Sequence, residues 1–320
     1  MCIRDRRYAI RRLPSAALVL AMSSVLVFAV PRLAEGDAAN VLAGPDASAA
    51  TIAAVRHDLG LDQPVFVQYL DWVQGLLRGD LGTSYVRHQP AAEAIGAALD
   101  QTATLTLGAL FVALLVGGVA GVVLGVSQNR VVTKVVGAFV SLAFALPPYV
   151  SGVLLVLLFA VTVRLLPAVG YVPLAQDPGI AVQHLLMPAV CLGLPAAAVI
   201  ARFLAASVRQ VQDEEFIRTG VAKGLLSRRL VWAHVIPNAL PPVLTVLGIQ
   251  VGQLLGGAIV VEAIFGWYGI GDLLVNSVLT RDYVLVQDLL LFTVAVFVVT
   301  QTLTDLAHAA VDPRVRLEAS

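Results

Sequence analysis

The sequence predicts an all-α integral membrane protein with six transmembrane helices, and three observations support this fold class. Hydrophobic residues make up 58% of the 320 residues and charged residues only 13%, whereas an average soluble domain is about half apolar and about a quarter charged. Six mainly apolar segments are long enough to cross about 30 Å of hydrocarbon. Basic residues are also distributed unevenly between the loops. The lipid bilayer is therefore the expected surrounding of most of the chain.

The six apolar segments define the expected spans. They lie at about 13–30, 101–127, 135–163, 185–206, 238–262 and 285–306. Pro147 and Pro148 predict a kink in the third segment, and Pro188 and Pro195 predict one in the fourth. The first segment follows a cluster of arginines, as in a signal peptide. It lacks a small-x-small cleavage site, so we expect it to remain as an anchor.

Basic residues predict the orientation of the chain. With the N-terminus inside, fifteen of the 21 lysines and arginines fall on the inner side and six on the outer side. This bias predicts that both termini are cytoplasmic. The expected organisation is a cytoplasmic N-terminus (1–12), an anchor (13–30), an external helical segment (31–100), a five-span core (101–310) with a cytoplasmic loop (207–237), and a cytoplasmic C-terminus (311–320).

The external segment is expected to form short amphipathic helices. Apolar residues recur at helical spacing in Ala49–Leu59 and Val65–Leu77. Gly60, Pro64 and Gly79 separate these helices from their neighbours.

Several chemistries are absent from the sequence. The two lysines, Lys134 and Lys223, are not part of a Gly-Lys-[Ser/Thr] phosphate loop, and neither an H-E-x-x-H nor a G-x-S-x-G motif occurs. We therefore predict no catalytic residue, no metal site and no cofactor bound by this chain. The balanced charge, with 21 basic and 21 acidic residues, carries no electrostatic footprint for nucleic acid. Four charged residues fall near span ends and form no evident proton relay, which argues against a proton-driven transporter: Arg202, Glu262, Asp288 and Asp305.

Two glycine ladders are expected to mediate close helix packing. Residues four apart share one helix face, so glycines at this spacing leave a groove that another helix can enter. The groove serves packing within the subunit or packing against a partner subunit. Gln250 and Gln253, beside the second ladder, line a polar path or form hydrogen bonds to another helix. The ladders are Gly117, Gly121 and Gly125 in the second span, and Gly248, Gly252 and Gly256 in the fifth.

The cytoplasmic loop has an ordered pattern of helix signals. Asp213 is expected to cap one short helix, which Gly224 ends in the left-handed conformation. Ser227 is expected to cap a second helix, from Arg228 to about Ile236, before Pro237 begins the next span. Two capped helices joined by a glycine favour docking to a cytoplasmic partner over a merely solvated connector.

The same loop resembles the EAA loop of binding-protein-dependent ABC importer permeases, in the form found in the dipeptide/oligopeptide/nickel family. Three further segments resemble this family, and the similarity as a whole runs from about residue 8 to 316. The matching segments are Arg218-Thr219-Gly220-x-Ala222-Lys223-Gly224-Leu225 with Ile236-Pro237-Asn238-Ala239; Leu59-Gly60-Leu61-Asp62-Gln63-Pro64 with Gly79-Asp80-Leu81-Gly82-Thr83-Ser84; Phe265-x-Trp267-x-Gly269-Ile270-Gly271 with Arg281-Asp282-Tyr283; and Asp305 with Asp312-Pro313-Arg314-Val315-Arg316.

The resemblance implies a type I ABC importer permease fold in the bacterial inner membrane. This chain would form half of the pathway for peptides or another small solute such as nickel, together with a second permease subunit, two ABC ATPase subunits and an external binding protein. ATP and Mg²⁺ would bind the ATPases, and Arg218, Thr219, Gly220, Ala222, Lys223, Gly224 and Leu225 would dock on them. Gly220 and Tyr268 depart from the family pattern, and the glycine is expected to weaken its helix by roughly 1 kcal/mol. The alternative is a stand-alone secondary transporter or channel.

Overall fold

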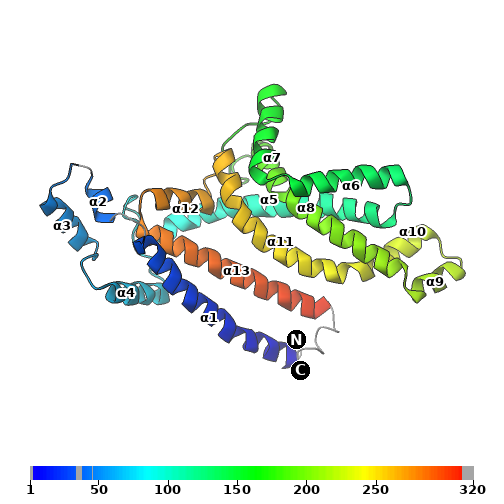
Figure 1. Ribbon diagram of the computed structural model, residues 1–320, viewed down its shortest axis with the longest axis horizontal. Helices are drawn as coiled ribbons and strands as arrows, with labels where there is room; N and C mark the ends of the chain where they lie inside the picture. The colour runs from blue at the N-terminus through cyan, green and yellow to red at the C-terminus, as the bar shows by residue number, and fades with distance from the viewer. Residues whose placement is uncertain (1–2, 34–37, 45, 312–320) are drawn as a thin grey trace. The chain divides into compact units, whose positions relative to one another are not determined.

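The computed structural model describes residues 3–33, 38–44 and 46–311, and its regular structure is helical apart from an isolated β-bridge between Thr83 and Pro90 (Figure 1). The C-terminal motif at 312–316 lies outside the described residues. The helices are α1 (Ile3–Leu33), α2 (Ala38–Ala43), α3 (Ala49–Asp58), α4 (Val65–Arg78), α5 (Ala91–Val126), α6 (Arg130–Ala145), α7 (Pro148–Leu155), the π-helix η1 (Val156–Thr162), α8 (Pro178–Gln212), α9 (Glu215–Ala222), α10 (Ser227–Leu230), the π-helix η2 (Val231–Val235), α11 (Ile236–Phe265), α12 (Ile270–Leu279) and α13 (Tyr283–Val311).

Five continuous helical segments are long and apolar enough to cross a membrane. They are Pro14–Leu33, Ala91–Val126, Pro178–Gln212, Ser227–Phe265 and Tyr283–Thr304. A sixth span is obtained if α6 and the α7–η1 helix count as one. The all-α membrane fold expected from the composition is confirmed. The spans expected to begin at about 101, 185 and 238 begin earlier, at Ala91, Pro178 and Ser227. In each case the helix continues into the more polar sequence that precedes the apolar segment.

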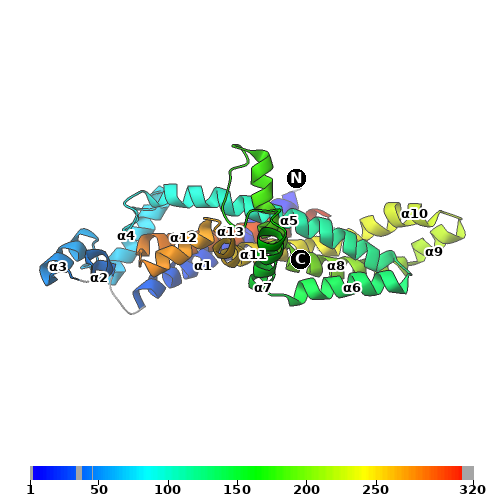
Figure 2. The ribbon, with the colours of Figure 1, turned by 90° about the horizontal axis from the view of Figure 1, so that it is seen from above.

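The expected kink in the third span is a sharp break. The α6 helix and the helix of α7 and η1 are bent by 108° at Pro147 and Pro148 (Figure 2). Leu146, which precedes the prolines, is extended with φ −77° and ψ 118°, as expected for a residue before proline. Pro148 then starts α7 at its first position, where the missing N–H costs no hydrogen bond.

The fourth span tolerates its prolines without a break. α8 begins after Asp177, whose Oδ1 accepts hydrogen bonds from the backbone N–H groups of Gly179 and Ile180 at 2.9 and 3.0 Å. It then continues as one helix through Pro188 and Pro195.

The chain separates into two compact units. Unit 1 comprises Met1–Gln101 and Tyr268–Val298, and unit 2 comprises Thr102–Trp267 and Val299–Ser320. In unit 1, the first turns of α5 pack with α12 and the start of α13 around Ile95, Leu273, Leu285 and Leu289. The α12 helix was not anticipated, because a ten-residue apolar segment is too short to register as a span.

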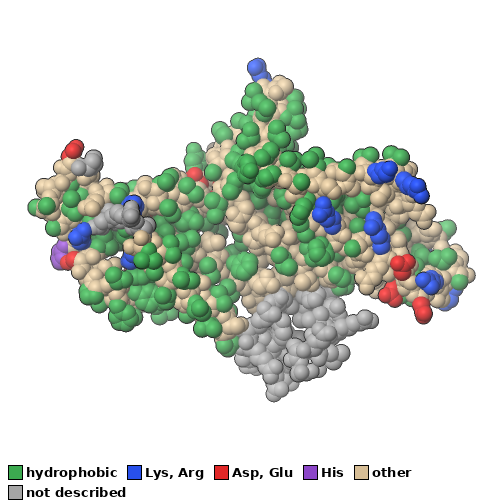
Figure 3. Space-filling model, in the orientation of Figure 1, with side chains coloured by type: hydrophobic (Ala, Val, Ile, Leu, Met, Phe, Trp, Pro, Cys, Tyr) green, Lys and Arg blue, Asp and Glu red, His purple; other side chains and the backbone are tan. Residues whose placement is uncertain are grey.

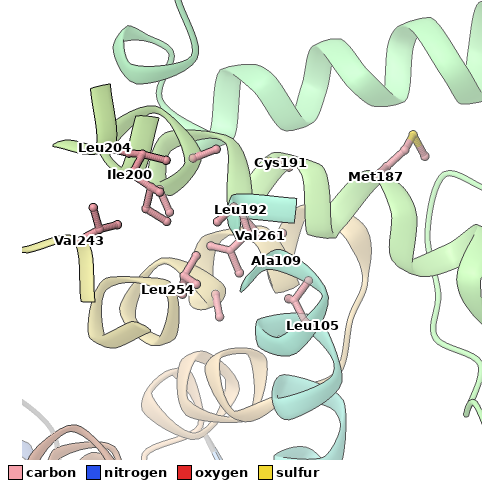
Figure 4. Packing of buried hydrophobic residues seen from close by; sticks show 14 of the residues in the cluster. Leu105, Ala109, Met187, Cys191, Leu192, Ile200, Leu204, Val243, Leu254 and Val261 are labelled. Carbon is pink, nitrogen blue, oxygen red and sulfur yellow. The ribbon is translucent and has the colours of Figure 1, made fainter. Parts of the chain in front are cut away.

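In unit 2, α8 supplies much of the buried core. Its apolar side chains meet those of α5 and α11, and α6 runs alongside it in both ribbon views. Figure 4 shows this packing at Leu105 and Ala109 of α5, Leu192 and Ile200 of α8, and Val261 of α11.

Candidate functional site

The loop between α8 and α11 forms a short helical hairpin, with α9 and α10 beyond the end of α8 (Figure 1). The two expected caps are wrong by one residue. Asp213 closes α8 as its C-cap, so the N-cap position of α9 falls on Glu214, whose side chain accepts no capping bond. Ser227 is the first residue of α10, and Leu226 occupies the N-cap position.

The turn after α9 has the predicted conformation at Gly224. This residue has a φ of +75°, which a side chain would strain. Its N–H donates to the Val221 carbonyl at 2.9 Å, and the Leu225 N–H donates to the Gly220 carbonyl at 3.2 Å. This pair of bonds is the Schellman motif. The loop therefore has a fixed turn rather than an irregular end.

Gly220 has a packing role that the sequence did not indicate. It is buried, and a Cβ built on it would lie 2.7 Å from Leu230 Cδ1 and 3.4 Å from Leu225 Cδ1. The missing side chain thus lets α9 approach α10 closely. Glycine has a lower helix propensity than alanine, but an alanine Cβ at this position would clash with Leu230. The departure from alanine therefore permits close packing as well as weakening the helix.

The outer surface of the hairpin combines basic and apolar side chains. Arg218, Lys223, Arg228 and Arg229 are exposed. Leu226 is 77% exposed, Val221 61% and Phe216 47%. Figure 3 shows charged side chains gathered over this end of unit 2. Exposed apolar residues rimmed by charge on a segment between two spans are typical of a protein interaction site.

The α10 helix continues without interruption into the next span. After Leu230 the chain passes through the π-helix η2 into α11, so that Ser227–Phe265 is one helical segment. The expectation that Pro237 begins the span is wrong, because the helical segment already begins at Ser227. Pro237 lies in the first turn of α11, directly after the π-helix η2, and does not interrupt the helix there. The hairpin is therefore joined to α11 by continuous helical backbone.

The first glycine ladder packs α5 against α8 inside this chain. A Cβ built on Gly117 would lie 2.6 Å from the Ala197 carbonyl oxygen, one on Gly121 2.8 Å from Leu204 Cβ, and one on Gly125 2.6 Å from Val208 Cγ1. None of the three positions has room for a methyl group. This ladder therefore serves packing within the subunit.

The second ladder is divided between two environments. A Cβ on Gly248 would overlap the Thr304 side chain of α13, and Gly252 is partly buried. In the described part of the chain, no atom lies within 4 Å of a Cβ built on Gly256. Gly248 is thus in close contact with α13, whereas a methyl group at Gly256 would meet no described atom.

Gln250 and Gln253 bond to each other along α11. Gln250 is 5% exposed, and its Nε2 donates to Gln253 Oε1 at 3.0 Å. Gln253 is exposed. The pair therefore presents one exposed amide on the same side of α11 as Gly256, three residues further on.

Two carboxylates near span ends are buried, which the sequence reasoning missed. Glu262 of α11 is 0% exposed, and Thr102 Oγ1 donates to its Oε1 at 2.6 Å within unit 2. Asp288 of α13 is 3% exposed, and Trp72 Nε1 donates to its Oδ1 at 2.8 Å within unit 1. Their position in otherwise apolar spans was the available signal.

Unit 1 brings together two of the sequence motifs. Asp282 is 1% exposed, and its Oδ2 accepts hydrogen bonds from the Ser84 hydroxyl and from the Val86 N–H. Its Oδ1 accepts from the Leu285 N–H at 3.3 Å, which caps α13. The turn at 79–84 is thereby attached to the start of the last span, about 200 residues away in sequence.

An aromatic cluster attaches the helix α4 to the first span. Phe28 lies 5.2 Å from Tyr69 and 5.7 Å from Trp72 between ring centroids. Arg32 stacks on Phe28 at 3.5 Å, and its guanidinium donates to Gln68 and Gln287. The α4 helix is therefore anchored to the apolar helices α1 and α13 by polar and aromatic contacts.

These features are those of a multi-span helical membrane protein with a helical hairpin between two of its spans, and comparison with known families identifies its class. Residues 117–317 match the model of the "Binding-protein-dependent transport system inner membrane component" family, and residues 6–106 match the N-terminal model of such membrane components. The chain belongs to this family of multi-pass inner-membrane proteins.

Relatives of similar length have related names. The chain is 34% identical over 309 residues to the "Probable peptide ABC transporter permease protein y4tP" of Sinorhizobium fredii, covering 97% of this chain and 99% of the relative. It is 38% identical over 310 residues to the "Glutathione transport system permease protein GsiC" of Escherichia coli K12, covering 97% and 98%. The chain is a permease subunit of an ABC importer, not a stand-alone transporter.

Solved structures agree on the fold. A structure of the MetNI methionine ABC transporter in an inward-facing conformation superposes with a TM-score of 0.58 and 19% identity, covering 69% of this chain and 97% of that chain. The fold is that of the type I ABC importer permeases.

Proposed function

We propose that this chain forms one half of a translocation pathway for short peptides and couples it to separate ATPase subunits through the hairpin at 213–236. The exposed apolar side chains of this hairpin carry the proposal. Phe216 and Val221 lie on α9, and Leu226 directly follows the turn that the Schellman motif fixes. Their exposure costs free energy in water, and a partner surface would remove it.

Docking involves both charge and shape. Arg218, Lys223, Arg228 and Arg229 surround the apolar side chains and match an acidic cleft on an ATPase. Each exposed ion pair is worth only about 0–1 kcal/mol, so the apolar contacts supply most of the affinity. ATP and Mg²⁺ bind the ATPases, and this chain hydrolyses no ATP by itself. The two states of the ATPase pair bind the hairpin differently, and that difference moves α11.

The assembly contains a second permease subunit, two ATPases and an external binding protein. The names of the relatives support peptides as the substrate class, with other small solutes as the alternative. The charge bias of the loops supports cytoplasmic termini and an external 31–100 segment. Cysteines at Asp46 and Ser227 should then react with an impermeant reagent from opposite sides of the membrane. Reaction from the same side would contradict this orientation.

The docking proposal is tested by Leu226→Asp. A charge at this exposed position leaves the fold intact and should reduce co-purification of the ATPase severalfold, together with transport. Leu77→Asp is the matched control, because Leu77 of α4 is 84% exposed and belongs to the external segment. Undiminished ATPase recovery with Leu226→Asp would refute docking through the hairpin.

A further inference from the structure

A cavity of about 470 Å³ lies within unit 1, between the loop at 87–89, the first turns of α5 and the start of α12. Its volume is in the usual range of small-molecule sites. A sphere of this volume is about 10 Å across. An extended chain covers at most about 3.5 Å per residue, so a peptide of two or three residues matches this length.

The lining carries both signs of charge together with small apolar side chains. Arg87 supplies a guanidinium group, and Glu93 and Asp272 supply carboxylates. Ala94, Ala97 and Ala98 line the cavity from one face of α5, and their short side chains occupy little of its volume. In the described part of the chain, neither the Arg87 guanidinium nor the Glu93 carboxylate takes part in an ion pair. Both charges are therefore available to a ligand.

The neutral polar groups suit a peptide backbone. Gln89 and Gln101 also line the cavity. A glutamine amide both donates and accepts hydrogen bonds, as does the peptide group between two charged termini. The α5 helix that provides Glu93 and Gln101 continues from this cavity into an apolar membrane span.

We propose that this cavity binds a short zwitterionic peptide, with the C-terminal carboxylate at Arg87 and the N-terminal ammonium at Glu93 and Asp272. The inference rests on the proposed transport of peptides and specifies its substrate class. One cation and two carboxylates give the cavity a net charge of −1. A peptide with neutral or basic side chains is therefore preferred over glutathione, which carries two carboxylates and one ammonium group.

The test is protection of a cysteine in the cavity. Ala97→Cys, in the full chain assembled with its partners and carrying Cys2→Ser, is labelled with N-ethylmaleimide. Cys191 remains, because it is 0% exposed. Ala92→Cys is the matched control, since Ala92 is exposed on the same helix but outside the lining. The ligands are Ala-Ala, N-acetyl-Ala-Ala, Ala-Ala amide and S-methylglutathione.

Saturating Ala-Ala should slow labelling of Ala97→Cys at least fivefold and leave Ala92→Cys unchanged. Blocking either terminus, or using S-methylglutathione, should require about tenfold more ligand for the same protection, because a hydrogen bond to a charged group is worth about that factor. In Arg87→Gln, Ala-Ala and its amide should protect equally. Arg78→Gln, an exposed arginine of α4 outside the cavity, should retain the difference.

Absence of protection, equal protection by all four ligands, or an unchanged preference for the free carboxylate in Arg87→Gln would each overturn the peptide site. ATP hydrolysis measured on the same samples separates this outcome from failure of the proposed function. If a binding protein loaded with peptide still stimulates hydrolysis, the peptide-transport proposal stands and only the cavity assignment is wrong. If it does not, the peptide-transport proposal fails as well.

Discussion

Replacement of Gly224 separates two roles of the turn between α9 and α10. Gly224 has a φ of +75°, and no atom of the described chain lies within 4 Å of a Cβ built on it. An alanine therefore meets no steric obstacle in the chain and is strained only in its torsion angles, by about 1–2 kcal/mol. If all of this strain opposed docking, the affinity for the ATPase would fall by a factor of about 5–30.

Gly224→Asp should cause less backbone strain than Gly224→Ala but should obstruct docking of the turn to the ATPase more. Aspartate enters the left-handed region more readily than alanine, but it adds bulk and negative charge beside Lys223 on the exposed surface. If the turn enters a cleft on the ATPase, Gly224→Asp should abolish substrate-stimulated ATP hydrolysis, whereas Gly224→Ala should only weaken it. The spans are unaffected, so membrane insertion should be normal in both variants.

The assay is ATP hydrolysis by the reconstituted transporter, with and without loaded binding protein, alongside the amount of ATPase that co-purifies. Wild-type stimulation in Gly224→Asp would show that the turn does not contact the partner. A greater loss in Gly224→Ala than in Gly224→Asp would show that strain alone matters and would refute the reasoning from obstruction.

Three further predictions concern the packing of α5, the Trp72–Asp288 hydrogen bond and the pKa of His57. Gly121→Ala should destabilise the chain by about 1–3 kcal/mol, because its Cβ would lie 2.8 Å from Leu204 Cβ. Gly118→Ala is the control, because no described atom lies within 4 Å of a Cβ built there. Equal melting temperatures of the two variants in detergent would contradict close packing of α5 on α8. Trp72→Phe should cost about 1–3 kcal/mol, since Asp288 Oδ1 loses its indole donor at 2.8 Å and stays buried. The double variant with Asp288→Leu should recover part of this loss, measured by proteolysis between α3 and α4, and no recovery would show that the hydrogen bond is not the cause. The hydrogen bond to Asp62 at 2.7 Å raises the pKa of His57 above its ordinary value. The attraction is therefore lost as pH rises through the pKa of His57, and Asp62→Asn should lower that pKa in an NMR titration; an unchanged value would refute the pairing.

The sequence predicted the parts of the fold that depend on local chemistry. Gly224 ends α9 in the left-handed conformation because few other residues adopt it without strain. Pro147 and Pro148 interrupt the third span because they cannot continue the hydrogen-bonding ladder, although the 108° angle depends on how α7 packs. The caps at Asp213 and Ser227 were misplaced by one residue, which is the usual uncertainty of helix ends.

The remaining features depend on contacts distant in sequence. The need for glycine at position 220 comes from the close approach of the Leu230 side chain. A scale of helix propensities does not include such a contact. Glu262 and Asp288 were placed near span ends, but their burial follows from Thr102 and Trp72, about 160 and 216 residues away. The cavity at Arg87 likewise requires α5 and α12 to meet, and α12 was too short to be recognised as an element.

On the proposed function, this chain transports substrate without hydrolysing ATP, and its energy comes from partner ATPases docked on the hairpin at 213–236. The most direct measurement is ATP hydrolysis in liposomes by the purified chain alone and by the chain with its ATPase subunits, second permease and loaded binding protein. Hydrolysis coupled to substrate uptake should occur only in the complete assembly and should disappear in Gly224→Asp. Hydrolysis by the purified chain alone, or uptake by the chain without ATPases, would contradict this account.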